Sequence, residues 1–100
     1  MDLYQNTGIK MQVIHEICDL ARENNVDKVI LFGSRARGDY KTKSDIDLAF
    51  SGGNWVKFTL AVDEETSTLL QFDIVNLNGA VQPELLESIE KEGILIYEKI

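Results

Sequence analysis

The chain of 100 residues contains one cysteine and one proline, no long apolar run and a shortage of positive charge. A lone cysteine, Cys18, cannot form a disulfide within the chain, which agrees with a reducing compartment. No apolar segment approaches the length of a membrane span, and the opening residues MDLYQNTG lack the charged-then-apolar pattern of a secretion signal. We therefore expect a cytoplasmic protein without a membrane partner.

The excess of acidic residues argues against binding to nucleic acid. The net charge is −7, and binding to a nucleic-acid backbone depends on neutralising its phosphates with Lys and Arg. We therefore expect no direct nucleic-acid binding. The chain has no repeats, linkers or low-complexity tracts, so we expect a single domain over residues 1–100 with a modest core.

Apolar periodicity predicts the order of the secondary-structure elements. The expected elements are a helix over 9–21, strands over 28–32, 45–50 and 69–75, a helix from Pro83 to Gly93, and a final strand over 94–97. Residues 55–67 fit a helix or a strand equally well.

Two carboxylates on one strand give the first functional signal. Successive side chains of a strand point to opposite faces, so Asp45 and Asp47 share one face while apolar side chains share the other. Two carboxylates held that close repel each other, and a hard divalent cation such as Mg²⁺ between them would remove the penalty.

A Gly-Ser pair gives the second signal, directly after an apolar run. Gly33 permits a positive φ and a close approach of backbone to a ligand. Ser34 offers a hydroxyl beside backbone amides that can hold phosphate, and Arg35 and Arg37 carry guanidinium groups suited to phosphate oxygens. The loop between Gly-Ser and the aspartates has four basic residues against one acidic residue, a local charge of +3, which leaves −10 for the rest of the chain. A solvated charged loop is the alternative, but its position between the two motifs favours a single-nucleotide site.

The pattern Gly33-Ser34, ten intervening residues and Asp45-x-Asp47 resembles the signature of the DNA polymerase β-like nucleotidyltransferases. More narrowly, GSRARG followed by SDIDLAF resembles the minimal nucleotidyltransferases, the MNT proteins usually paired with a HEPN-domain protein. The resemblance covers most of the chain. It implies an α/β (α+β) fold with a small mixed β-sheet and helices packed on one side, and it favours a helix for residues 55–67.

The family also uses a third carboxylate on a neighbouring strand, and Asp73 is the candidate. Phe72 and Ile74 flank it, so Asp73 points to the opposite face of its strand. An acid within an apolar strand needs a partner, and the separation from Asp47 leaves room for a helix and a turn. The alternative is an edge-strand acid that faces solvent. We expect Asp45, Asp47 and Asp73 to be the catalytic, metal-binding residues.

The resemblance implies nucleotidyl transfer with two Mg²⁺ ions, or Mn²⁺, and ATP or another NTP as substrate. The residues expected to hold the nucleotide are Gly33, Ser34, Arg35 and Arg37. In MNT–HEPN pairs the HEPN protein is a toxin RNase, and the MNT protein is an antitoxin that transfers AMP to a tyrosine of the toxin. The resemblance therefore implies a HEPN-domain partner in a hetero-oligomer.

Two other hypotheses stay open. The protein could be a nucleotide-binding antitoxin that neutralises its partner by contact alone, without catalysis. It could also be an enzyme that modifies a small molecule, which is the weaker hypothesis because 100 residues leave no room for an acceptor-binding domain.

Overall fold

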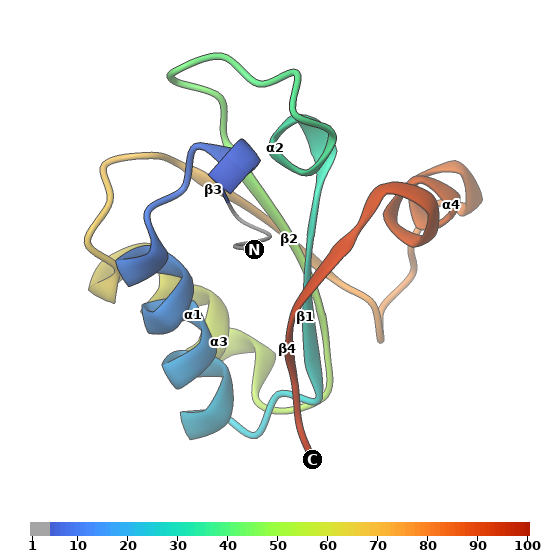
Figure 1. Ribbon diagram of the computed structural model, residues 1–100. Helices are drawn as coiled ribbons and strands as arrows, with labels where there is room; N and C mark the ends of the chain where they lie inside the picture. The colour runs from blue at the N-terminus through green and yellow to red at the C-terminus, as the bar shows by residue number, and fades with distance from the viewer. Residues whose placement is uncertain (1–4) are drawn as a thin grey trace.

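The computed structural model describes residues 5–100. Helices and strands alternate along most of the chain (Figure 1). In chain order they are the 3-10 helix η1 (Gln5–Thr7), α1 (Met11–Glu23), β1 (Lys28–Phe32), α2 (Gly33–Arg37), β2 (Ile46–Ser51), α3 (Trp55–Glu65), β3 (Phe72–Asn76), α4 (Pro83–Glu92) and β4 (Ile94–Glu98).

The ambiguous segment after β2 is a helix, as the family resemblance predicted. Asn54 caps its first turn, because the side-chain oxygen accepts a hydrogen bond from the backbone N–H of Lys57 at 3.2 Å. The strand expected from Leu69 begins instead at Phe72. The residues before it form a turn tied to α1, in which the backbone N–H and hydroxyl of Ser67 both donate to the carboxylate of Glu16, at 2.7 and 2.6 Å.

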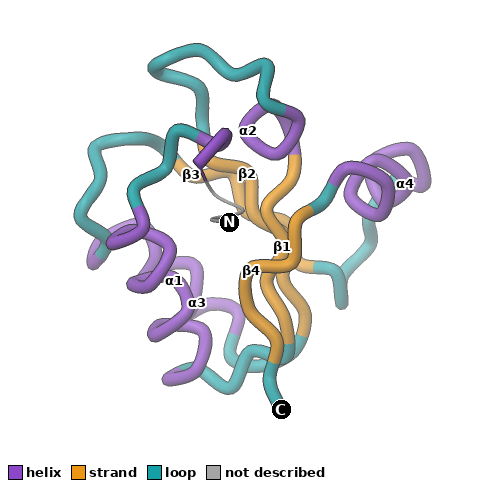
Figure 2. Tube along the Cα trace, in the orientation of Figure 1, coloured by secondary structure: helices purple, strands orange, loops and turns teal. Residues whose placement is uncertain are grey.

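The four strands form one mixed sheet in the order β3-β2-β1-β4 (Figure 2). β1 is antiparallel to both of its neighbours, whereas β2 and β3 are parallel and are joined across α3. The carboxyl end of β1 therefore lies beside the amino ends of β2 and β3. α2 follows β1 at this same end of the sheet.

Helices cover both faces of the sheet. α1 and α3 pack side by side on one face (Figure 1), over a core that includes Leu31, Leu48 and Phe50. α4 packs on the other face, where Ile89 contacts Phe32 and Ala49. The expectation that the helices lie on one side is therefore correct for α1 and α3 and wrong for α4. The physical reason is that β1 and β2 carry apolar side chains on both faces, so both faces need cover.

No helix among residues 5–100 is both long enough and apolar enough to cross a membrane.

Candidate active site

The sheet register brings two of the predicted acids together. Asp47 of β2 is paired with Asp73 of the parallel strand β3, so their side chains leave the same face of adjacent strands. Asp45 lies two residues before Asp47, just ahead of β2, and alternation directs it to the same side. This is the sheet face that α4 partly covers, because Ala49 of the α4-facing cluster shares it with Asp47.

The electrostatics of Asp47 reflect this crowding. Its pKa is raised from 3.8 to about 6, first by partial burial and then by the negative charges of Asp73 and Asp45. The positive charges of Arg37 and Arg35 oppose that rise in part. A cation bound beside Asp47 would offset the repulsion that this carboxylate experiences.

The oxygen atoms of Asp45, Asp47 and Asp73 suit a hard divalent cation, although the three carboxylates do not converge on one point. Within residues 5–100 no three His, Cys, Asp or Glu side chains are gathered closely enough to hold a metal ion as they stand. Asp45 and Asp73 are exposed and Asp47 is half-buried. Since carboxylate oxygens are the ligands that Mg²⁺ prefers, the two exposed side chains could turn toward an ion beside Asp47.

Gly33 lies directly against this acid. Its φ is +75°, a conformation that side-chain-bearing residues rarely adopt. A Cβ at this position would collide with the carboxylate of Asp47, with the Asp47 Cγ only 2.9 Å away. The predicted positive φ is therefore confirmed, and the close neighbour is the carboxylate itself.

The segment expected to be a phosphate loop begins as a short helix, α2. Ser34 lies in its first turn and is half-buried. Its backbone carbonyl accepts hydrogen bonds from the N–H groups of Gly38 and Asp39, at 2.8 and 3.1 Å. Gly38 ends the helix with a left-handed φ of 92°.

Arg35 does not have the role predicted for it. Its side chain is 2% exposed, and its guanidinium donates to three backbone carbonyls. These are Thr7 at 2.8 Å, Ser44 at 3.1 Å and Thr42 at 3.2 Å. The Tyr40 ring packs on its remaining face, with the centroid 4.8 Å from Cζ. This geometry contradicts the prediction that Arg35 binds phosphate, because its Nε, Nη1 and Nη2 all hold the α2–β2 loop and η1 together.

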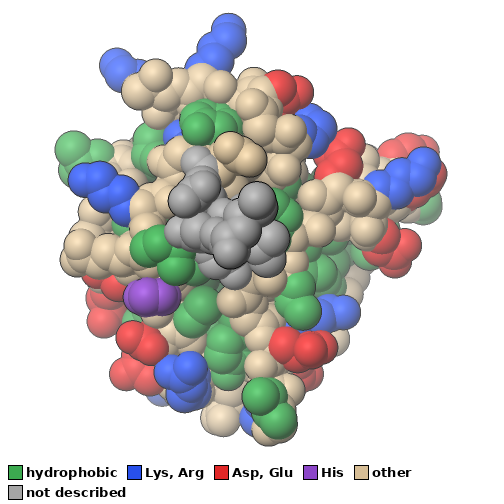
Figure 3. All heavy atoms as spheres, viewed as in Figure 1, with side chains coloured by type: hydrophobic (Ala, Val, Ile, Leu, Met, Phe, Trp, Pro, Cys, Tyr) green, Lys and Arg blue, Asp and Glu red, His purple; other side chains and the backbone are tan. Residues whose placement is uncertain are grey.

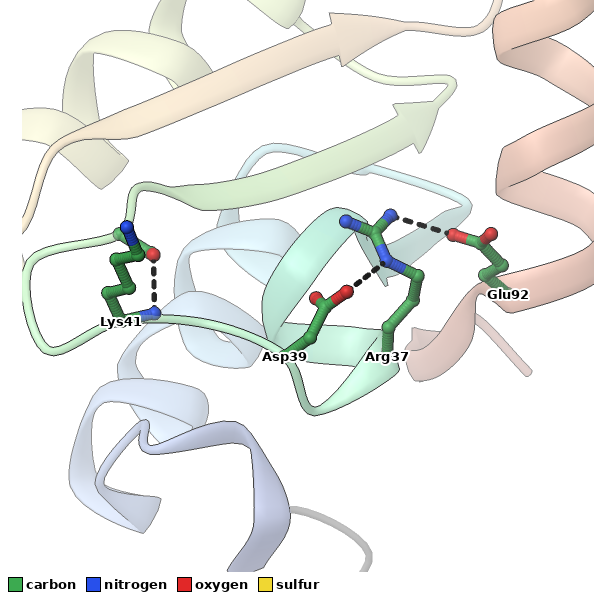
Figure 4. Close-up of polar contacts among 5 residues, drawn as sticks. Arg37, Asp39, Lys41 and Glu92 are labelled. Atoms are coloured by element: carbon green, nitrogen blue, oxygen red, sulfur yellow. Dashed lines mark hydrogen bonds and ion pairs between the residues drawn. The ribbon is translucent and has the colours of Figure 1, made fainter.

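Arg37 lies near the acids and is partly exposed. It is three residues after Ser34, so both lie on the same side of α2. Its Nε donates to Asp39 at 3.2 Å and its Nη1 donates to Glu92 at 3.0 Å (Figure 4). These two ion pairs, with Glu92 the stronger influence, raise the pKa of Arg37 above its ordinary value.

Glu92 was not among the residues that the sequence pointed to. It reaches Arg37 from the end of α4, 55 residues further along the chain. No local pattern marks such a contact, since it depends on how α4 packs over the sheet.

The charge on the surface follows the predicted division. Basic side chains project from the loop between α2 and β2, at the top of the view, and acidic side chains predominate lower on this face and over α4 (Figure 3). Lys41 and Lys43 of that loop are exposed. The loop between α2 and β2 is therefore a basic segment on an otherwise acidic molecule.

Comparison with known proteins agrees with this arrangement. Residues 13–100 match the model of the family described as "Polymerase beta, Nucleotidyltransferase". The chain belongs to this family, and the prediction made from the two motifs is confirmed. It is also 44% identical over 82 residues to a protein of Methanocaldococcus jannaschii, named "Putative protein adenylyltransferase MJ0604", covering 72% of this chain and 79% of the relative. We conclude that the protein is a nucleotidyltransferase.

Solved structures share the fold. A toxin-antitoxin structure with AMP-PNP matches with a TM-score of 0.65 and 24% identity, covering 86% of this chain and 73% of the other. A mutant of the toxin-antitoxin MntA-HpeT matches with a TM-score of 0.64 and 22% identity, with the same coverage. At this identity the likeness shows that the fold is the predicted one.

Proposed function

We propose that the protein transfers AMP from ATP to a hydroxyl group of a partner protein, a tyrosine of a HEPN-domain toxin, and so acts as an antitoxin in the cytoplasm. The observation that carries the proposal is the pairing of Asp47 with Asp73 on one sheet face, with the backbone of Gly33 against the first acid. The name of the Methanocaldococcus jannaschii relative supports adenylyl transfer to a protein. The toxin-antitoxin matches support a toxin as the partner.

The three acids would hold the metal ions of the reaction. We assign two Mg²⁺ ions, or Mn²⁺, to Asp45, Asp47 and Asp73. When bound, such ions make an attacking hydroxyl more acidic and neutralise a departing pyrophosphate.

The remaining roles follow from where each side chain lies. β3 is an edge strand and Asp73 is exposed, so Asp73 faces the side from which a second protein can approach. We assign it to orient the acceptor hydroxyl and accept its proton. The acceptor oxygen then bonds to the α-phosphorus of ATP as the bond to the β-phosphate oxygen breaks, and pyrophosphate leaves.

Residues of α2 would hold the leaving group. The Ser34 hydroxyl and the backbone N–H groups of the first turn of α2 would bind the β- and γ-phosphates. Arg37 would neutralise the charge that develops on pyrophosphate, with the N–H groups that its ion pairs leave open. Positioning and electrostatics therefore carry most of the catalysis.

The test is the mass of the partner. The purified cognate HEPN-domain protein is incubated with this protein, ATP and Mg²⁺, and its intact mass is measured. We expect an increase of one or more AMP units with the wild type and none with Asp47→Asn. If the partner is neutralised without any gain in mass, and Asp47→Asn neutralises it equally well, the contact-only hypothesis replaces this one.

A further inference from the structure

We infer that Glu92, the last residue of α4, is a positioning residue of the active site that acts through Arg37. This inference rests on the proposed function and assigns a role to a residue that lies outside the sequence motifs. Glu92 itself need not touch the nucleotide. It fixes the direction in which the guanidinium of Arg37 faces the phosphates.

The guanidinium is held at two points. Asp39 accepts from Nε at 3.2 Å and Glu92 accepts from Nη1 at 3.0 Å (Figure 4). Asp39 is only two residues from Arg37 and moves with the same loop, whereas Glu92 belongs to a separate helix. Two anchors from different elements fix the plane of the group, and they leave Nη2 and the outer N–H of Nη1 for phosphate oxygens.

Glu92 is carried by a firmly packed helix end. Ile89, one turn earlier in the same helix, is buried against the sheet and only 2% exposed. The N–H of Gly93 donates to the Ile89 carbonyl at 2.9 Å, and a Cβ on Gly93 would lie 2.5 Å from the Cγ2 of Ile30 in β1. The end of α4 is therefore pressed onto the sheet, so the backbone that presents the Glu92 carboxylate has little freedom to move.

This ion pair differs from the others on the surface. The pair between Lys91 and Glu87 joins neighbouring turns of α4, and its side chains are 73% and 66% exposed. The Arg37–Glu92 pair is 43% and 36% exposed and joins two helices. An exposed ion pair contributes little to the stability of a fold, so a structural role does not explain the placement of the Arg37–Glu92 pair.

The location of Arg37 explains it better. Arg37 lies one turn after Ser34 on α2, and the backbone of Gly33, which opens this helix, lies against the Asp47 carboxylate. A guanidinium held by the loop alone could rotate and pair with the Asp47 carboxylate, which the metal ions need. By holding Arg37, Glu92 keeps the metal-binding carboxylate free and the cation directed at the leaving group.

A double-mutant cycle tests the inference, with binding as the readout. Calorimetry with AMP-PNP and Mg²⁺ is carried out on the wild type, Glu92→Gln, Arg37→Gln and the double variant. We expect Glu92→Gln to weaken binding about fivefold, and the double variant to bind as Arg37→Gln does, because coupled residues are not additive. Binding of AMP, which lacks the β- and γ-phosphates, should change less than about twofold.

Glu87→Gln is the matched control, since it removes the same charge from the same helix without touching Arg37. It should leave the affinity for AMP-PNP unchanged. The inference is overturned if Glu92→Gln binds like the wild type, or if it weakens binding equally in the Arg37→Gln background. Failure of the wild type to bind AMP-PNP with Mg²⁺ would overturn the proposed function as well, so the two failures are distinguishable.

Discussion

The backbone of Gly33 and the carboxylate of Asp47 lie so close together that a Cβ on Gly33 would collide with it. The two residues belong to different elements, because Gly33 opens α2 after β1 while Asp47 lies in β2. They meet because Phe32, the residue before Gly33, is the register partner of Asp47. The Gly-Ser motif and the aspartate motif thus form one site through an antiparallel strand pair.

Replacing Gly33 should be costly for two separate reasons. In Gly33→Ala the residue must hold a φ of +75° and its Cβ must displace the Asp47 carboxylate. We expect a loss of roughly 2–3 kcal/mol in the free energy of unfolding, measured by urea denaturation. Gly38→Ala is the control, since φ is 92° there but nothing lies within 4 Å of an added Cβ. It should lose only about 1 kcal/mol, and an equal loss in the two variants would contradict the collision.

Metal-free stability should depend on pH through Asp47. Because its pKa in the folded protein is about 6, above the ordinary 3.8, the folded state binds the proton more tightly than the unfolded state. The stability linked to this group is therefore present below about pH 4 and is lost as the pH rises toward and through 6.

Asp47→Asn removes that titration. In EDTA at pH 7.5 we expect the variant to be more stable than the wild type by roughly 1 kcal/mol, a figure discounted because the carboxylate is only half-buried. The difference should disappear near pH 3.5. Denaturation curves at the two pH values check this, and a variant less stable at pH 7.5 would show that the acid is a structural element.

Truncation of Arg35 should mainly lower stability, whereas truncation of Arg37 should mainly weaken nucleotide binding. Arg35→Ala leaves three backbone carbonyls without their donor and opens a cavity beneath Tyr40. We expect it to lower the free energy of unfolding by about 2–4 kcal/mol. Arg37→Ala, at an exposed side chain, should lower the free energy of unfolding much less than Arg35→Ala does, and it should instead weaken binding of AMP-PNP. The reverse order of stabilities would contradict the roles assigned to them.

Much of this arrangement can be predicted from the sequence because it depends on local pattern. The alternation around Asp47 and Asp73 fixes the face on which each acid lies, and the apolar run before Gly33 fixes the strand that precedes it. Gly33 indicates a positive φ, which other residues rarely adopt, and the structure shows a φ of +75° at this position.

The rest depends on contacts between distant segments. Arg35 and Arg37 look alike in the sequence, and only the folded structure shows that the first is buried beneath the α2–β2 loop while the second stays partly exposed and pairs with Glu92. The position of α4 on the second sheet face depends on how Ile89 packs against Ala49, and the contact of Glu92 with Arg37 follows from that packing. The apolar periodicity of a single helix or strand contains no information about these contacts between distant segments.

The central claim is that Asp45, Asp47 and Asp73 form one metal-dependent nucleotide site, and calorimetry with ATP tests it most directly. The wild type should bind ATP clearly with Mg²⁺ or Mn²⁺ and weakly or not at all in EDTA. Asp47→Asn should lose the metal-dependent part. Equal affinity with and without the metal, in the wild type, would contradict the account.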